Sequence, residues 1–242
     1  MSREQALLST LVELADTLVD EFDALDFMHT LTQRSVELLS ADAAGVIIAD
    51  QRGDLQVLAS TSQEARVLEV FQVQNGEGGP CVECYRTQRP LVNLDVDQVA
   101  GRWPRFSQAC LDAGFRSCHA LPMRLRNQTI GALNLYCVGQ TPLTDTDVAL
   151  GQAMADIATI ALLQERLNRQ QEILSEQLQT ALNSRVLIEQ AKGVLSERAD
   201  IDVETAFDRL RAHARRSRQP LTQVAGAVIA GTLEVSESVA DE

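Results

Sequence analysis

Hydrophobic positions change period several times along the first 140 residues, which predicts short helices and strands in alternation. Leucines at helical spacing over residues 7–18 are followed by a second helical stretch from about Asp26 to Leu39. Two short apolar runs at 45–49 and 55–58 then flank a turn-like segment. This pattern is typical of a β-hairpin.

The next expected elements are a helix, a glycine-rich loop, a strand, a helix and a second hairpin, at residues 63–73, 75–80, 91–94, 104–113 and 118–138. Gly114 follows the second of these helices, at a position where glycine commonly ends a helix. About five strands are expected, and the strongest pairs are hairpins rather than βαβ units. The N-terminal region is therefore predicted to be α+β, with an antiparallel sheet flanked by helices.

After Pro142 the pattern becomes helical and stays helical, because no proline occurs from residue 143 to 219. Thr144 and Asp147 resemble a capping box at the start of this stretch. Apolar residues at near-heptad spacing follow at Ile160, Leu163, Leu167 and Leu174. We predict one long helix that lies on the sheet up to residue 163 and continues as a coiled-coil linker in a parallel homodimer.

The C-terminal residues predict a compact three-helix unit. The long helix continues to about Arg198, and Asp202 caps a second helix. The apolar stripe of this second helix consists of Val203, Phe207, Leu210 and Ala214. Pro220 ends it, and Thr222 is expected to cap a third helix before an acidic tail.

Composition and charge narrow the classes of function. The formal net charge is −13, so nucleic acid is repelled unless basic residues gather in one place. They do so at residues 209–218, which hold five arginines, at 209, 211, 215, 216 and 218, and no acid. Arginine binds phosphate oxygens in a planar fork and stacks on bases, although a charged helix face is often simply solvated. No apolar run long enough for a membrane span and no signal peptide are seen, so a cytoplasmic protein is expected.

The five cysteines raise an alternative reading of the chain as a thiol-based redox or metal sensor. Cys81 and Cys84 form the close pair, and Cys110, Cys118 and His119 could complete a metal site in space. Cys81 is expected at a helix start, where the pKa of a thiol falls. Buried, unreactive cysteines are the simpler interpretation. No catalytic motif is found, so no enzyme, metal site or cofactor is predicted.

Residues 178–195 resemble the first helix of the ANTAR domain, with the core Ile-x-Gln-Ala-Lys-Gly at 188–193. The similarity continues through Ala206-Phe207-x-x-Leu210-Arg211 and Ala214 to Leu221-Thr-Gln-Val-Ala225. Lys192, the one lysine in the chain, lies where this family carries a lysine.

Residues 1–165 resemble the GAF domain that often precedes ANTAR in actinobacterial regulators. The similar segments are Gly76–Cys81, Trp103-Pro104, Gly114–Ser117 and Leu121–Leu135. The resemblance thus covers a GAF-like sensor domain at 1–163, a helical coiled-coil linker at 164–182, an ANTAR RNA-binding domain at 183–235 and an acidic tail at 236–242.

This resemblance implies a transcription antiterminator. ANTAR domains bind nascent mRNA with two adjacent stem-loops of six-nucleotide loops, and thereby prevent the terminator hairpin from forming; a homodimer offers one domain to each hairpin. The residues that it assigns to RNA contact are Lys192, Arg211, Arg215, Arg216, Arg218, Thr222 and Gln223. The GAF domain implies a small-molecule ligand whose identity is unknown. DNA binding by the C-terminal helices, and methionine sulfoxide reduction through Cys81, stay open as alternatives.

Overall fold

The computed structural model describes residues 23–74, 78–233 and 235, together with residues 5, 9, 10, 12 and 13. It consists of two compact units, residues 1–167 and residues 168–242, which are described separately. Most of the helix predicted at 7–18, the centre of the glycine-rich loop and the acidic tail from residue 236 lie outside the described residues.

The first unit is built on a five-stranded antiparallel sheet in the order β2-β1-β5-β4-β3. Its strands are β1 (Ala43–Ala49), β2 (Leu55–Ser60), β3 (Leu91–Asp95), β4 (Ser117–Leu125) and β5 (Gln128–Cys137). Both predicted hairpins are present, as β1–β2 and β4–β5. The α+β prediction is confirmed.

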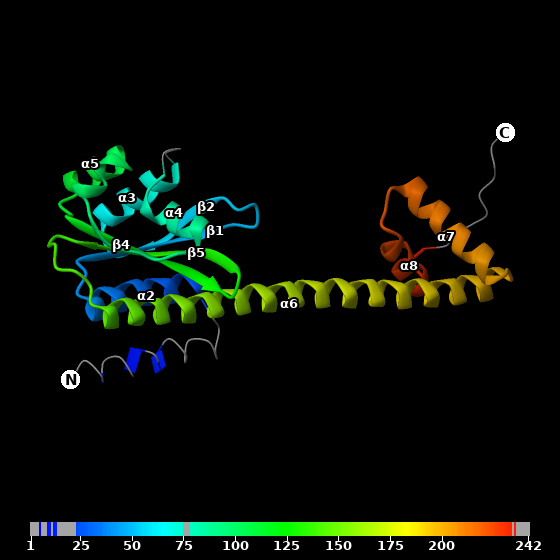
Figure 1. The fold of residues 1–242 in the computed structure, drawn as a ribbon. Coiled ribbons are helices and arrows are strands. Elements are labelled where there is room, and N and C mark those ends of the chain that lie inside the picture. The colour runs from blue at the N-terminus through cyan, green and yellow to red at the C-terminus, as the bar shows by residue number, and fades with distance from the viewer. Residues whose placement is uncertain are drawn as a thin grey trace. The chain divides into compact units, whose positions relative to one another are not determined.

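Helices cover the two faces of this sheet (Figure 1). On one face lie α2 (Ala24–Leu39) and the first part of α6 (Asp145–Ala199); on the other lie α3 (Gln63–Gln74), α4 (Pro80–Thr87) and α5 (Pro104–Asp112). A short 3-10 helix, η1 (Gln98–Gly101), precedes α5. Because strand side chains alternate between faces, β5 packs Leu133 toward α2 and α6 and places Tyr136 on the side of α3 and α5.

Two expected helix starts are corrected by the structure. Asp23, not Asp26, caps α2, and its Oδ1 accepts hydrogen bonds from the backbone N–H groups of Leu25 and Asp26 at 2.8 and 3.3 Å. Both aspartates suit the cap position, so helical periodicity alone does not choose between them. Thr222 is not the cap of the last helix, because Pro220 occupies that position with an extended backbone.

The long helix is confirmed as α6, and its start carries the predicted capping box. The Thr144 N–H donates to Asp147 Oδ2 at 3.0 Å, and the Asp147 N–H donates to Thr144 Oγ1 at 3.2 Å. Among the described helices, α6 alone is long and apolar enough to meet the minimum for crossing a membrane. Its apolar residues Met154, Ala155 and Ala158 are fully buried in the core of the first unit. A buried core helix passes the same test, so this is weak evidence for a membrane.

The second unit combines the C-terminal part of α6 with α7 (Val203–Ser217) and α8 (Leu221–Ile229). Asp202 caps α7 as predicted, because its Oδ1 accepts the Thr205 N–H at 2.8 Å. The three helices share a hydrophobic core whose fully buried members include Ala191, Ala206, Leu210, Val224 and Ala225. The predicted three-helix unit is confirmed.

Candidate nucleic-acid interface

Four arginines form an exposed basic surface at the C-terminal end of α7 and the turn that follows it. We call this surface the basic face; its members are Arg211, Arg215, Arg216 and Arg218. Leu210 and Ala214 turn inward to the core, which leaves the side chains beside them pointing to solvent. In the part of the chain that the structure describes, none of the four forms an ion pair. Their charges are therefore available to a polyanion.

Arg218 lies beyond the helix, so it does not continue the row that Arg211 and Arg215 form on α7. The helix ends at Ser217, and Arg218 is the C-cap with a left-handed backbone, φ 55°. Its N–H donates to the Arg215 carbonyl at 3.3 Å. Arg211 and Arg215 remain one turn apart on α7, and Arg218 extends the basic face into the turn before α8.

Lys192 has a different environment from the basic face. Its Nζ lies 2.9 Å from Glu189 Oε2 and 5.5 Å from the ring centroid of Phe207 on α7. Only 17% of its side chain is exposed. The lysine therefore joins α6 to α7 by a cation–π contact, and an RNA phosphate would have to compete with Glu189 for its charge.

The first turn of α8 is a limited site for an anion. Gln223 is exposed and Thr222 is half-buried. The N–H of Gln223 already donates to the Pro220 carbonyl at 3.0 Å, as that of Val224 does at 3.2 Å. Only the N–H groups ahead of them, including that of Thr222, remain to bind phosphate at this helix start.

The cysteines do not have the environment expected of a reactive thiol. All five are reduced and buried. Cys81 is the second residue of α4, as predicted, but burial raises its pKa well above the ordinary value instead of lowering it. Burial likewise raises the pKa of Cys84 to about 12. The thiolate that metal binding and redox exchange require is thus disfavoured.

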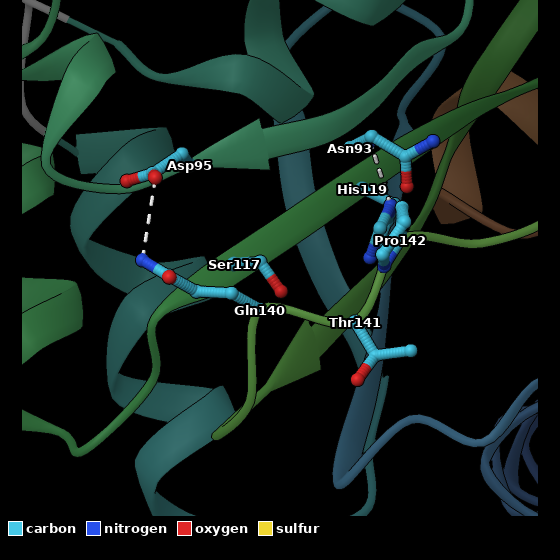
Figure 2. A pocket seen from close by; sticks show the side chains of 7 residues that line it. All are labelled: Asn93, Asp95, Ser117, His119, Gln140, Thr141 and Pro142. Carbon is cyan, nitrogen blue, oxygen red and sulfur yellow. Dashed lines mark hydrogen bonds between the residues drawn. The ribbon is translucent and has the colours of Figure 1, made fainter.

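His119 does not join Cys110 and Cys118 in a metal site. Within the described residues, no three His, Cys, Asp or Glu side chains are grouped so that they could hold a metal ion. His119 instead lines a small pocket of about 70 Å³. Figure 2 shows it there beside Asn93 and Pro142. Its Nδ1 accepts the Asn93 N–H at 2.9 Å, and burial lowers its pKa to about 4.

Sequence reasoning missed a buried polar network between α3 and the sheet. Its members are Glu69 and Gln72 on α3 and Asn134 and Tyr136 on β5, all at most 2% exposed. Asn134 and Tyr136 sit in a strand that otherwise reads as apolar, which is the one signal that could have pointed to them. The two α3 residues have the spacing of an ordinary solvent-facing pair.

Comparison with known protein families assigns both units. The family model of the GAF domain matches residues 23–163, and that of the ANTAR domain matches residues 176–229. The chain is a GAF–ANTAR regulator. All seven residues predicted to contact RNA lie inside the ANTAR match. Searching the curated proteins gave no match.

Solved structures share the fold of the GAF domain. One is the GAF domain of a phosphoenolpyruvate-protein phosphotransferase from Coxiella burnetii, with 13% identity, a TM-score of 0.53 and coverage of 69% of this chain and 98% of that chain. Another is the GAF domain/HD domain protein from Geobacter sulfurreducens, with 21% identity, a TM-score of 0.50 and coverage of 60% of this chain and 95% of that chain. At these identities the likeness shows the fold alone.

The general kind of function follows from the two domains. ANTAR is an RNA-binding antitermination domain, and GAF is a sensory domain, so the GAF–ANTAR chain is an RNA-binding transcription regulator with a sensory module. Both domains are regulatory, one sensory and the other RNA-binding.

Proposed function

We propose that this GAF–ANTAR protein binds two adjacent stem-loops with six-nucleotide loops in nascent mRNA and so prevents the terminator hairpin from forming. The observation that carries the proposal is the basic face, an exposed group of four arginines without ion pairs in the described structure of a chain with net charge −13. A polyanion is repelled by most of this acidic surface and attracted at one place.

Arginine suits the loop of an RNA hairpin better than its stem. Loop bases are unstacked, so a guanidinium plane can stack on them while its N–H groups bind phosphate. The major groove of an A-form stem is too deep and narrow for side chains to read its bases. Lys192, Thr222 and Gln223 lie in the same domain and are included in the proposed contact, with Lys192 exchanging Glu189 for phosphate.

The proposal includes a homodimer through the coiled-coil linker at 164–182. Ile160, Leu167 and Leu174 repeat every seven residues on α6 and are 43%, 59% and 55% exposed. Leu178 and Leu182 follow at spacings of four residues, with exposures of 62% and 57%. Rows of exposed leucine at heptad spacing are typical of a two-stranded coiled coil. A parallel pair of linkers brings two ANTAR domains to one transcript.

We further propose that the protein acts in the cytoplasm and catalyses no reaction. The proposed C-terminal boundaries of the GAF-like domain, the linker and the ANTAR domain lie near residues 163, 182 and 235. The alternative of a thiol or metal sensor at Cys81 and Cys84 gains no support from the buried, high-pKa thiols. Helix-turn-helix binding to DNA is kept as an outcome of the test that follows.

The test is a gel-shift titration with a tandem-hairpin RNA at two salt concentrations, against loop-scrambled RNA and duplex DNA. Neutralising about four phosphates of a single-stranded loop predicts a slope of log affinity against log salt near −3. Arg215→Ala should weaken binding and flatten this slope by about 0.7. Arg52→Ala, which removes one exposed arginine from the β1–β2 turn, is the matched control and should change neither.

Equal affinity for RNA with scrambled loops would show that the basic face binds RNA without sequence specificity, which would contradict the proposal. Preference for duplex DNA would replace it with the helix-turn-helix interpretation.

A further inference from the structure

A carboxyl group is buried at the centre of the GAF domain. Glu69 on α3 has no exposed surface. The Asn134 amide donates to both of its oxygens at 2.9 Å, and the Tyr136 hydroxyl donates to Oε1 at 3.0 Å. A buried carboxylate normally has a cation beside it, because two neutral donors offset only part of the cost of leaving water.

Within the described residues no cation faces Glu69, and His119, which lines the gap beside the network, is neutral because burial lowers its pKa to about 4. The titratable groups around it are Cys81 from α4, Cys118 from β4 and Tyr136 from β5, and each is neutral or negative. Cys110 from α5 lies beyond Tyr136 and is also a thiol. Across the described ranges, no Lys, Arg or His forms an ion pair with Glu69. The ionised form therefore lacks a counter-charge, whereas the protonated form needs none.

Two glycines leave space for the side chains of Glu69 and Gln72. A Cβ on Gly45 of β1 would lie 2.3 Å from Glu69 Oε1, and a Cβ on Gly79 would lie 2.3 Å from Gln72 Oε1. Any larger residue at either place would displace the network. Two glycines thus keep open the space that the two polar side chains of α3 occupy.

The network also ties α3 and α4 to the sheet. Gln72 Nε2 donates to the Tyr136 hydroxyl at 3.0 Å, and Gln72 Oε1 accepts the N–H of Cys81 at 3.1 Å. Glu69 and Gln72 are on α3, Cys81 is at the start of α4 and Tyr136 is on β5. A change in the charge of Glu69 therefore affects the packing of both α3 and α4 against the sheet.

The interior around the network has no space for an organic ligand. The gap bounded by Gln72, Cys81, Phe106, Asn134 and Tyr136 is too small for a water molecule. Asn134 Oδ1 is buried there and accepts no hydrogen bond. The network therefore contains one hydrogen-bond acceptor for which it has no donor. A proton is the ligand small enough to enter, and it supplies a donor.

We infer that the interior of the GAF domain is a proton-binding site centred on Glu69, and that release of the proton loosens α3 and α4 from the sheet. Burial, the largest cause, raises the pKa of Glu69 to about 7, and the hydrogen bonds from Asn134 and Tyr136 only partly oppose it. A groove of about 220 Å³ between α3, α4 and the β1–β2 turn reaches Gln72 from outside, which brings solvent close to the network.

The experiment is a pH titration of the full-length protein by infrared difference spectroscopy, with hydrogen exchange of α3 and α4 measured in parallel. Carbon-13 labelling of glutamate marks the carboxyl C=O band. One protonated glutamate should lose this band with a midpoint near pH 7, and Glu69→Gln should lack the band. If opening restores the ordinary pKa of 4.5, the open population of α3 and α4 should rise about tenfold from pH 6 to pH 8, after correction for intrinsic exchange.

Tyr136→Phe gives a second test that does not depend on the folding of Glu69→Gln. It removes a donor to the carboxylate, so the midpoint should move upward by about one pH unit. No titrating glutamate band in the wild-type protein between pH 5 and pH 9, or an unchanged midpoint in Tyr136→Phe, would overturn the inference. No RNA enters these measurements, so their outcome is independent of the proposed antitermination.

Discussion

The stability of the GAF domain should depend on pH through Glu69. Its pKa is about 7 in the folded state against an ordinary value of 4.5, so the folded domain holds the proton more tightly than the unfolded chain does. The stabilisation is therefore complete below pH 4.5 and is lost as pH rises through 7. Integrating the linkage relation between pH 5 and pH 8 gives a loss of about 2.5 kcal/mol in the free energy of unfolding.

Trp103 makes this loss measurable in the intact chain. It is the one tryptophan in the sequence, is 5% exposed, and packs in the GAF core with Phe106 and Tyr136. Urea denaturation followed by its fluorescence therefore reports the GAF domain and not the ANTAR domain. The experiment compares wild type with Glu69→Gln at pH 5 and pH 8, because the difference cancels the other titrating groups.

The wild-type free energy of unfolding should fall by about 2.5 kcal/mol more than that of Glu69→Gln over this interval. The glutamine amide can donate to Asn134 Oδ1, which has no donor in the wild-type structure, once the Asn134 amide has turned over. The reasoning is refuted if the two proteins show the same pH dependence. It is also refuted if wild type becomes more stable relative to Glu69→Gln as pH rises.

Three further predictions concern the sheet and the linker. A Cβ on Gly131 would lie 2.0 Å from the Ile47 carbonyl oxygen. Gly131→Ala should therefore lower the free energy of unfolding of the GAF domain by about 3 kcal/mol or more in the Trp103 assay. Gly101 has open space around it, so Gly101→Ala should change this free energy little. Leu174→Asp should convert a dimer to a monomer in sedimentation experiments, and an unchanged mass would contradict the coiled-coil proposal. Ser175→Pro should interrupt α6 at a cost of about 3 kcal/mol and weaken both dimer and RNA binding, while Ser175→Ala should retain them.

The parts of the fold that were predictable from sequence are those governed by local patterns. The two hairpins, the capping box at Thr144 and the left-handed Gly114, with φ 87°, depend on residues close together in the chain. The predicted helix start was wrong where two residues close in sequence both suit the N-cap position, as Asp23 and Asp26 do. Local chemistry does not rank such pairs, because the packing of the whole helix decides.

The candidate site was predictable only in part, for a physical reason. Sequence shows where charge lies but not what faces it. Arg215 was expected at an exposed position and is found there, whereas Lys192 is held between Glu189 and the ring of Phe207. The Glu69 network depends on contacts across more than 60 residues of chain, so no local pattern contains it. The expected fall in the pKa of Cys81 failed because burial outweighs the effect of a helix start.

The helix α6 contributes to the hydrophobic cores of both units, which bears on how a signal could pass between them. Near its start Gly151 lies so close to Leu121 of β4 that a Cβ would stand 2.6 Å from that side chain. Near its end Ala191 and Leu195 belong to the ANTAR core. One continuous helix therefore packs against the sheet near its start and supports α7 near its end.

The strand β5 connects the proton-binding site to that helix. Asn134 and Tyr136 project to the Glu69 side, and the intervening Leu133 and Leu135 pack among residues on the opposite face. One strand therefore contacts both the Glu69 network and the core on which α6 lies. This contiguity predicts that the protonation of Glu69 and the affinity for RNA are coupled. The coupling would be established if, at constant salt, the RNA affinity of wild type and of Arg52→Ala changed between pH 6 and pH 8 while that of Glu69→Gln did not.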